Sequence, residues 1–243
     1  MATGDQVEQD LLLSRLIVEI ANDEYLGDEL VFRGGTCLHK VCLPFPWRYR
    51  EDLDYVRRSG GGIAELTRAL TRVGERLEME VRTRISQHPK VFFRAGFESG
   101  SGPMKVKVEV NTFERSPART PELVPFAVDT SWFTGATMVT TFTVAEMLAT
   151  KIRALFQRSK GRDLFDLWLG LTVLQVDPAE ILDCLAPYRP DGFTARRAIL
   201  NLEAKLGDEA FRRDLEPLVS TWPDGYSVQD AEELIVETLL TRL

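Results

Sequence analysis

Two short motifs near residue 50 contain the residue types that phosphate chemistry needs. A Gly-Gly-Thr turn at residues 34–36 comes shortly before Asp52 and Asp54, which are separated by one leucine. In a β-strand alternate side chains point the same way, so the two carboxylates would share a face. Paired carboxylates suit Mg²⁺, and glycine lets backbone N–H groups approach a phosphate. The spacing therefore predicts a metal-dependent site for a nucleoside triphosphate.

Each motif also has an ordinary structural explanation. Asp-x-Asp is common in surface turns, where the aspartate side chain bonds to its own backbone. Gly-Gly-Thr is a common connection from a strand to a helix, with the threonine as N-cap. The order of the motifs gives them weight, because an apolar strand predicted at Leu30–Phe32 leads into the turn and a second strand predicted at Leu53–Val56 carries the two acids at its start.

A third group of candidate residues lies in two helices further along the chain. Thr143 and Glu146 form a capping box that opens a helix predicted to end near Gln157. Lys151 falls within the apolar stripe of this helix, so it either points inward or extends along the edge of the stripe to solvent.

Asp163 and Asp166 share one face of the next predicted helix, Asp163–Leu174, among apolar neighbours. Buried carboxylates are usually paired with cations, and Lys151, Arg153 and Arg162 are available for that. Structural pairing and a catalytic role both remain open for these two acids.

The predicted elements divide the chain into a sheet-containing part and a helical part, which indicates an α+β fold. We expect an N-terminal helix ending near Asn22 and a helix over Ile63–Leu77. Strands are predicted over 79–86, 91–98, 104–113 and 138–142, and further helices over 178–185, 194–206, 209–219 and 228–240. The predicted boundary separates a core domain, residues 1–142, from a helical domain, residues 143–243.

Composition narrows the possible functions. The net charge of −7 means that a nucleic acid would have to meet a local basic patch. Arg68, Arg72 and Arg76 recur on one helix face, and Arg82 and Arg84 follow shortly after. This stripe could follow a phosphate backbone, or it could form a solvated face. Three cysteines without a C-x-x-C pair, and no apolar run long enough for a membrane span, indicate a cytoplasmic protein. Two histidines make His-based zinc sites and triads poor candidates.

The motifs together resemble those of the AbiEii/MenT-like nucleotidyltransferases, which are the toxins of toxin–antitoxin and phage-abortive systems. The matching runs cover about two-thirds of the chain in the family's order. They are residues 8–15 (EQDLLLSR), 32–40 (FRGGTCLHK), 48–54 (RYREDLD), 107–111 (KVEVN), 151–155 (KIRAL) and 162–167 (RDLFDL).

This resemblance implies a polymerase-β-like nucleotidyltransferase core followed by a helical C-terminal region that completes the active site. It implies Asp52, Asp54, Lys151 and Asp163 as catalytic residues, and Asp52, Asp54 and Glu109 as ligands of Mg²⁺ or Mn²⁺. The residues implied for nucleotide binding are Gly35, Thr36, Arg48 and Lys151.

The resemblance also implies that a nucleoside triphosphate is the substrate, that the 3′ end of tRNA is the acceptor, and that a cognate antitoxin is encoded nearby. Transfer to a protein or small-molecule hydroxyl, and a non-catalytic nucleotide-binding module, are the alternatives. One departure is Arg50, where the family commonly has serine. Its guanidinium could bind a triphosphate or an RNA phosphate, or pair with Glu51.

Overall fold

The computed structural model describes residues 4–98, 100 and 102–243, and it has the predicted α+β fold. The chain forms two compact units. The first contains the residues up to Cys42 together with Tyr49–Ser116 and Pro121–Phe142. The second contains Thr143–Leu243 and two short earlier segments, Leu43–Arg48 and Pro117–Thr120. These two segments could not be assigned from the sequence, because they carry no helical or strand periodicity.

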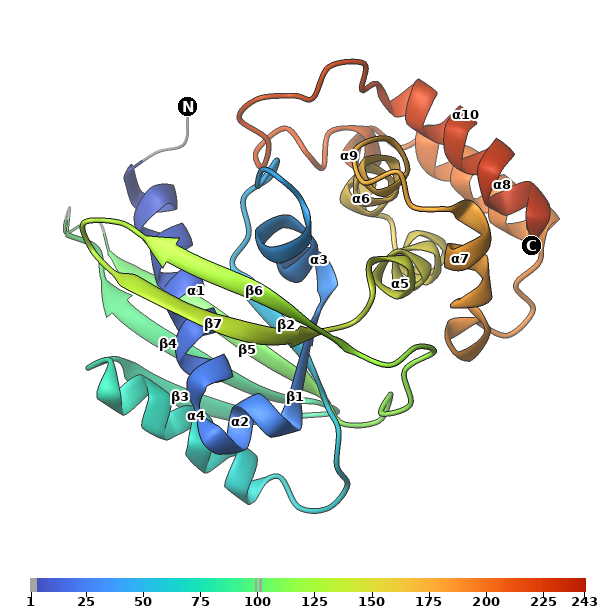
Figure 1. The fold of residues 1–243 in the computed structure, drawn as a ribbon. Coiled ribbons are helices and arrows are strands. Elements are labelled where there is room, and N and C mark those ends of the chain that lie inside the picture. Colours follow the sequence, from blue (N-terminus) through green and yellow to red (C-terminus); the bar gives the residue numbers. More distant parts are fainter. Residues whose placement is uncertain (1–3, 99, 101) are drawn as a thin grey trace. The chain divides into compact units, whose positions relative to one another are not determined.

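A seven-stranded mixed sheet with strand order β3-β4-β5-β2-β1-β7-β6 forms the first unit (Figure 1). β2 runs antiparallel to β1 and parallel to β5, so it lies in the middle of the sheet. The strand bounds are β1 Leu30–Arg33, β2 Asp52–Arg57, β3 Glu80–Ile85, β4 Pro89–Gly96, β5 Pro103–Asn111, β6 Glu122–Asp129 and β7 Thr134–Thr141.

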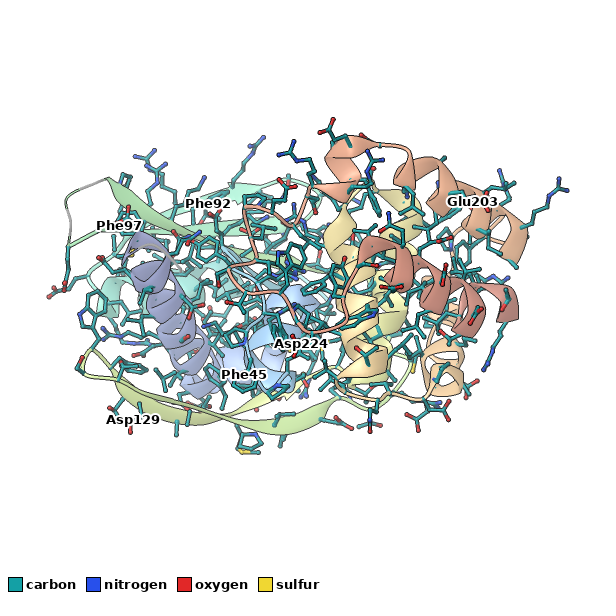
Figure 2. The ribbon with its side chains drawn as sticks, turned by 90° about the horizontal axis from the view of Figure 1, so that it is seen from above. Phe45, Phe92, Phe97, Asp129, Glu203 and Asp224 are labelled. Atoms are coloured by element: carbon teal, nitrogen blue, oxygen red, sulfur yellow. The ribbon has the colours of Figure 1, made fainter. Side chains whose placement is uncertain are left out.

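Helices cover one face of the strands β3, β4 and β5. α1 (Gly4–Asn22) packs against β5 and β7, and α4 (Ala64–Arg76) packs against β3 and β4. The side chains beneath them are apolar and fully buried, and they alternate along β4 and β5: Val91, Phe93, Val106, Val108 and Val110. Alternation places the intervening residues on the opposite face, where they are exposed or half-buried; Phe92, labelled in Figure 2, is one of them.

Two elements of this unit were not predicted. The helix α2 (Glu24–Glu29) is too short to produce a helical period, and β6 contains Pro125. Proline lacks the N–H that a central strand would use, but β6 is an edge strand, where proline is tolerated. Its partner β7 begins at Thr134, four residues before the predicted start.

The connection between β1 and β2 consists of α3 (Gly34–Cys37) followed by a π-helical turn, Leu38–Cys42. Cys37 is buried inside it. This connection places the Gly-Gly-Thr turn directly beside the beginning of β2, because β1 and β2 are neighbouring strands.

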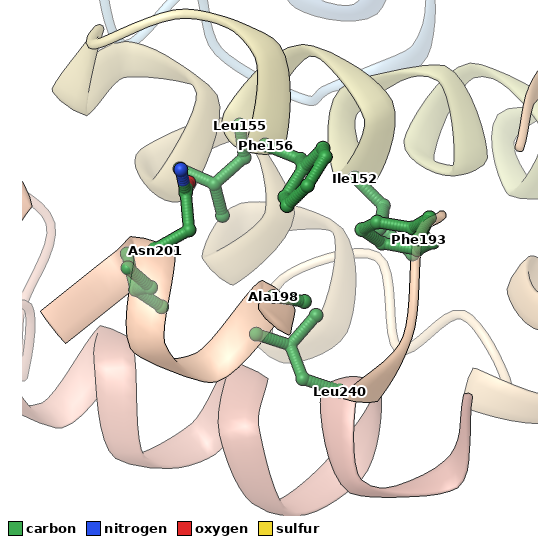
Figure 3. A pocket seen from close by; sticks show the side chains of 8 residues that line it. Ile152, Leu155, Phe156, Phe193, Ala198, Asn201 and Leu240 are labelled. Carbon is green, nitrogen blue, oxygen red and sulfur yellow. The ribbon is translucent and has the colours of Figure 1, made fainter. Parts of the chain in front are cut away.

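Helices make up the second unit. They are α5 Val144–Gln157, α6 Gly161–Thr172, α7 Pro178–Asp183, α8 Ala195–Leu206, α9 Glu209–Arg212 and α10 Val228–Thr238. α9 ends seven residues before its predicted end, because the ring of Pro217 would clash with the helix backbone one turn earlier. Figure 3 shows an apolar gap beneath Phe156 and Phe193; its volume is about 10 Å³, so it has room for about one water molecule and for no larger ligand.

In the part of the chain that the structure describes, we find no helix with the length and apolar character needed to cross a membrane.

Candidate active site

Three carboxylates gather on one face of the central strands in the first unit. Asp52 and Asp54 alternate along β2, so they share a face, as the sequence predicts. In the parallel pairing of β2 with β5, Asp52 is the partner of Lys107 and Asp54 is the partner of Glu109. Glu109 therefore lies beside the Asp-x-Asp pair, on the strand from which the third carboxylate was expected.

Lysine side chains compensate two of these three carboxylates. Lys107 Nζ lies 3.0 Å from Asp52 Oδ2 and 3.2 Å from Glu109 Oε2, while Lys90 Nζ lies 3.3 Å from the same Glu109 oxygen. Burial raises the pKa of Glu109, but the two lysines outweigh it and hold the pKa below its ordinary value. Burial alone would lower the pKa of Lys107. Its contacts with Asp52 and Glu109 have the larger effect, so the pKa of Lys107 lies above its ordinary value.

Asp54 has the least compensation of the three. Burial raises its pKa, the charge of Asp52 raises it further, and the positive charges of Arg33 and Lys107 offset this only in part. An ionised carboxylate in such a place is stabilised by additional positive charge.

The donor set fits a hard divalent cation. Within residues 4–98, 100 and 102–243, no three His, Cys, Asp or Glu side chains are gathered closely enough to hold a metal ion as they stand. The carboxylate oxygens are nevertheless the ligands that Mg²⁺ and Mn²⁺ prefer. A cation, the ammonium group of Lys107, already lies between Asp52 and Glu109. Burial and the charge of Asp52 raise the pKa of Asp54, and a nearby positive charge would stabilise its ionised form.

The Gly-Gly-Thr turn is joined to this group of carboxylates by direct contacts. Gly34 has a φ of +79°, and a Cβ atom there would lie 2.8 Å from Asp54 Oδ2, so glycine is required on both counts. The hydroxyl of the buried Thr36 donates a hydrogen bond to the backbone carbonyl of Asp52. This bond ties the turn to the first residue of β2. The predicted phosphate contacts of Gly35 and Thr36 remain predictions.

The side chain of Arg50 packs against the same turn. A Cβ atom on Gly35 would fall 1.3 Å from Arg50 Nη2, so the guanidinium group rests directly against the backbone of Gly35. The residue in which this chain departs from the family that it resembles therefore places a positive charge at the predicted phosphate-binding turn.

Replacement of Gly35 by alanine is expected to displace Arg50 and to weaken the binding of a nucleoside triphosphate about tenfold, because hydrogen bonds from a guanidinium to phosphate are charge-assisted. Only the flexible end of Arg50 has to move, so the melting temperature should change little.

Arg50→Ser should weaken nucleotide binding to the same extent as Gly35→Ala. The Gly35→Ala/Arg50→Ser double variant should weaken it no further. Gly62→Ala, which meets open space, is the control; additive losses in a binding titration would contradict a shared mechanism.

In the second unit, Lys151 is 5% exposed and directed inward, which is the first of the two alternatives that the sequence left open. Its Nζ lies 3.1 Å from Asp163 Oδ1 and 2.8 Å from Asp166 Oδ2. Both acids are buried completely. Lys151 is thus confirmed as a partner of both acids, while Arg162 pairs with Asp214 and Arg153 lies over the ring of Tyr188.

Arg48 and Arg158 also contact the two acids. Arg48 donates from Nε and Nη2 to Asp166, at 2.9 and 2.6 Å, and Arg158 donates to both oxygens of Asp163, at 2.7 and 2.8 Å. Burial raises the pKa of Asp163, but Lys151 and Arg158 together hold it below the ordinary value. Burial lowers the pKa of Arg48, and Asp166 partly restores it.

We call Arg48, Lys151, Arg158, Asp163 and Asp166 the buried ion cluster. It contains three cations and two carboxylates, so it is positively charged overall. Arg48 uses two of its nitrogens for Asp166, and its third, Nη1, is buried with no hydrogen-bond partner among the described residues. The role of Arg48 and Lys151 in nucleotide binding, and of Asp163 in catalysis, remains a prediction.

The pairing of Arg48 with Asp166 was not found by sequence reasoning. The two residues lie 118 positions apart, and Arg48 belongs to a short segment without periodicity. The isolated acidic pair on an apolar helix was the only signal, and it showed that a cation was needed without showing which one.

Comparison with known proteins places the chain among nucleotidyltransferases. A family model described as "Nucleotidyl transferase AbiEii toxin, Type IV TA system" matches residues 15–234. No curated protein matches the chain. Among solved structures, JHP933 from Helicobacter pylori has 13% sequence identity and a TM-score of 0.61, and the match covers 100% of this chain and 95% of that one.

Two further structures are similar over most of their length. A second H. pylori structure, described as that of a "putative nucleotidyltransferase", has 14% identity and a TM-score of 0.57, with 100% of this chain and 97% of that chain covered. MenT4, a nucleotidyltransferase toxin from Mycobacterium tuberculosis, has 17% identity and a TM-score of 0.49, with 95% and 93% covered. At these identities the two H. pylori structures show a shared fold, consistent with the α+β prediction.

Proposed function

Because the chain belongs to the AbiEii family of nucleotidyltransferase toxins from type IV toxin–antitoxin systems, we propose that it transfers a nucleotide from a nucleoside triphosphate to the 3′ end of a tRNA in a reaction that requires Mg²⁺. The observation that carries the metal requirement is the placement of Asp52, Asp54 and Glu109 on one face of neighbouring strands. The tRNA acceptor rests on the resemblance of the sequence motifs.

In this proposal Asp52, Asp54 and Glu109 would hold Mg²⁺ or Mn²⁺. A bound ion of this kind lowers the pKa of an attacking hydroxyl and neutralises charge on the transferred phosphate. The contacts with Lys90 and Lys107 hold the pKa of Glu109 below its ordinary value, so this carboxylate is ionised and can serve as a ligand.

The Gly-Gly-Thr turn and Arg50 would bind the triphosphate. Gly34 and Gly35 leave their backbone N–H groups accessible, and the Arg50 guanidinium lying on Gly35 adds charge-assisted donors. The acceptor hydroxyl attacks the α-phosphorus, and pyrophosphate leaves as the new phosphodiester bond forms. Fixing both reactants in this way would lower the activation barrier through their orientation as well as through charge stabilisation.

Lys151 and Asp163 are proposed as further active-site residues on the strength of the motif resemblance. The positive charge of the buried ion cluster supports a role near phosphate, because its cations outnumber its carboxylates.

A labelling experiment tests the proposed acceptor. The purified chain is incubated with Mg²⁺, total tRNA and each of four nucleoside triphosphates labelled at the α-phosphate, and the products are separated into RNA and protein. Label on tRNA that disappears with EDTA is the expected result. Label on protein alone would show that the acceptor is a protein and not a tRNA. Label on neither would exclude both acceptors. Comparison of the four nucleotides gives the base preference.

Membership of this toxin family also implies that a cognate antitoxin protein exists. We propose that the antitoxin is encoded beside the toxin gene. Expression of the chain alone should arrest growth, and co-expression of the neighbouring gene should restore it.

A further inference from the structure

The face of the sheet opposite α1 and α4 carries a dense group of cations. Strand pairing aligns its side chains in rows across β3, β4 and β5. Each row contains one residue from β3, one from β4 and one from β5, in that order. The three rows are Arg84–Lys90–Glu109, Arg82–Phe92–Lys107 and Glu80–Arg94–Lys105. We call these nine residues the open sheet face.

The open sheet face has six cations and two carboxylates, in a chain whose net charge is −7. A protein with a negative net charge needs such a local excess of positive charge to bind a polyanion. The cations of α4 differ, because Arg68 and Arg72 are paired with Glu65, and Arg76 with Asp23.

Three cations of the open sheet face have no carboxylate partner in the described chain. Arg84 and Arg94 form no ion pair there, and the Nε of Arg94 is buried without a hydrogen-bond partner. Lys105 is exposed, and its Nζ lies 4.6 Å from the centre of the Phe92 ring. A half-buried phenylalanine beneath a lysine, on a charged face, is a surface on which a nucleobase can stack while its phosphate meets the cation.

A groove connects this surface to the carboxylates. It is open to solvent, has a volume of about 290 Å³, and lies where β2 begins beside the first residues of β5. Its lining contains two lysines, two carboxylates and an aromatic ring, from Gln9, Glu51, Asp52, Phe92, Pro103, Lys105 and Lys107. The distance from β3 across β4 and β5 to the Asp-x-Asp pair on β2 is roughly 14 Å. A chain bound along it would end at the carboxylates.

We propose that the open sheet face binds the single-stranded 3′ end of the acceptor RNA, with Phe92 stacking on a base and Arg84, Arg94 and Lys105 contacting phosphates. This inference rests on the proposed function, since it supplies the surface that holds the acceptor. Single-stranded RNA fits because a flat sheet face with an aromatic side chain needs unpaired bases.

RNA binding without catalysis tests the proposal. The probe is a fluorescein-labelled, unstructured 12-nucleotide RNA ending in CCA, titrated with the full chain in EDTA and followed by fluorescence anisotropy at two salt concentrations. Arg84→Gln/Arg94→Gln/Lys105→Gln should weaken binding more than tenfold at low salt and reduce the salt slope by about 2, since each phosphate contact on a single strand contributes about 0.7. Phe92→Ala should weaken binding about tenfold with the slope unchanged, and Phe92→Trp should restore it.

The control removes the same charge from α4. Arg68→Gln/Arg72→Gln/Arg76→Gln should leave the affinity within about twofold of the wild-type value, because these arginines are paired with acids. Equal weakening by the two triple variants, or wild-type binding by the variant of the open sheet face, would overturn the proposal.

The labelling experiment separates this inference from the proposed function. If the wild-type chain labels tRNA and the open-face variants do so with an unchanged KM, the function stands and the inference fails. A raised KM with kcat unchanged supports both. If the wild-type chain labels no RNA, the proposed function fails, and the anisotropy titration alone decides whether the open sheet face binds RNA.

Discussion

Asp54→Asn is expected to reduce nucleotide transfer by at least a hundredfold and to leave the protein folded with an equal or higher melting temperature. The amide keeps the shape of the side chain but lacks the charge that a divalent cation requires. Stability should not suffer, because burial and the neighbouring Asp52 raise the pKa of Asp54 and make its ionised form unfavourable in the folded chain. Removal of that charge relieves the repulsion.

The measurement pairs a transfer assay with thermal unfolding in the absence of metal. Asp129→Asn is the matched control, since it removes one carboxylate from the exposed edge strand β6 and should keep full activity. Wild-type activity in Asp54→Asn would remove the Asp-x-Asp motif from the mechanism. A fall of more than a few degrees in melting temperature would show instead that Asp54 is a structural residue.

Asp166→Asn is expected to cause the largest loss of stability in the second unit. It leaves the fully buried guanidinium of Arg48 without its carboxylate, and it takes one of the two acids from Lys151. Breaking a buried ion pair costs about 3–5 kcal/mol. For a chain of this size, that corresponds to a fall in melting temperature of roughly 6–20 °C.

Asp163→Asn separates catalysis from structure in the same cluster. Lys151 keeps Asp166 in this variant, and Arg158 can turn its half-exposed side chain to solvent, so the stability loss should be smaller than for Asp166→Asn. Activity should nevertheless be lost if Asp163 takes part in the reaction. Asp183→Asn, which breaks an exposed pair with Arg119, should change the stability by no more than about 0.5 kcal/mol. If Asp163→Asn destabilises the chain as much as Asp166→Asn, the structural role of Asp163 is favoured.

The sequence predicted the parts of the fold that depend on periodicity. The helix opened by Thr143 and Glu146 has the predicted bounds, because a capping box and an apolar stripe mark both its start and its buried face. The strand beginning at Asp52 was predicted from its apolar residues, and the orientation of its two acids follows from alternation. Pro125 concealed β6, because a proline argues against a strand until its place at the sheet edge is known.

Contacts between distant parts of the chain could not be predicted. Arg48 and Asp166 meet through tertiary packing, and no local pattern joins them. The rows of the open sheet face were also hidden, because alternation shows which residues of β5 point outward but not which residues of β4 lie beside them. The same strand pairing was needed to recognise that Lys107 lies between Asp52 and Glu109.

Alternation along β5 has a genetic consequence. Val106 and Val108 belong to the core, while Lys105, Lys107 and Glu109 belong to the opposite face, so a deletion of one codon would exchange the two sets and unfold the chain. Cells selected for escape from the toxin could thus lose the protein through a length change in this strand. A missense codon at Asp54 would give a different kind of escape, in which a folded but inactive chain is expected to persist.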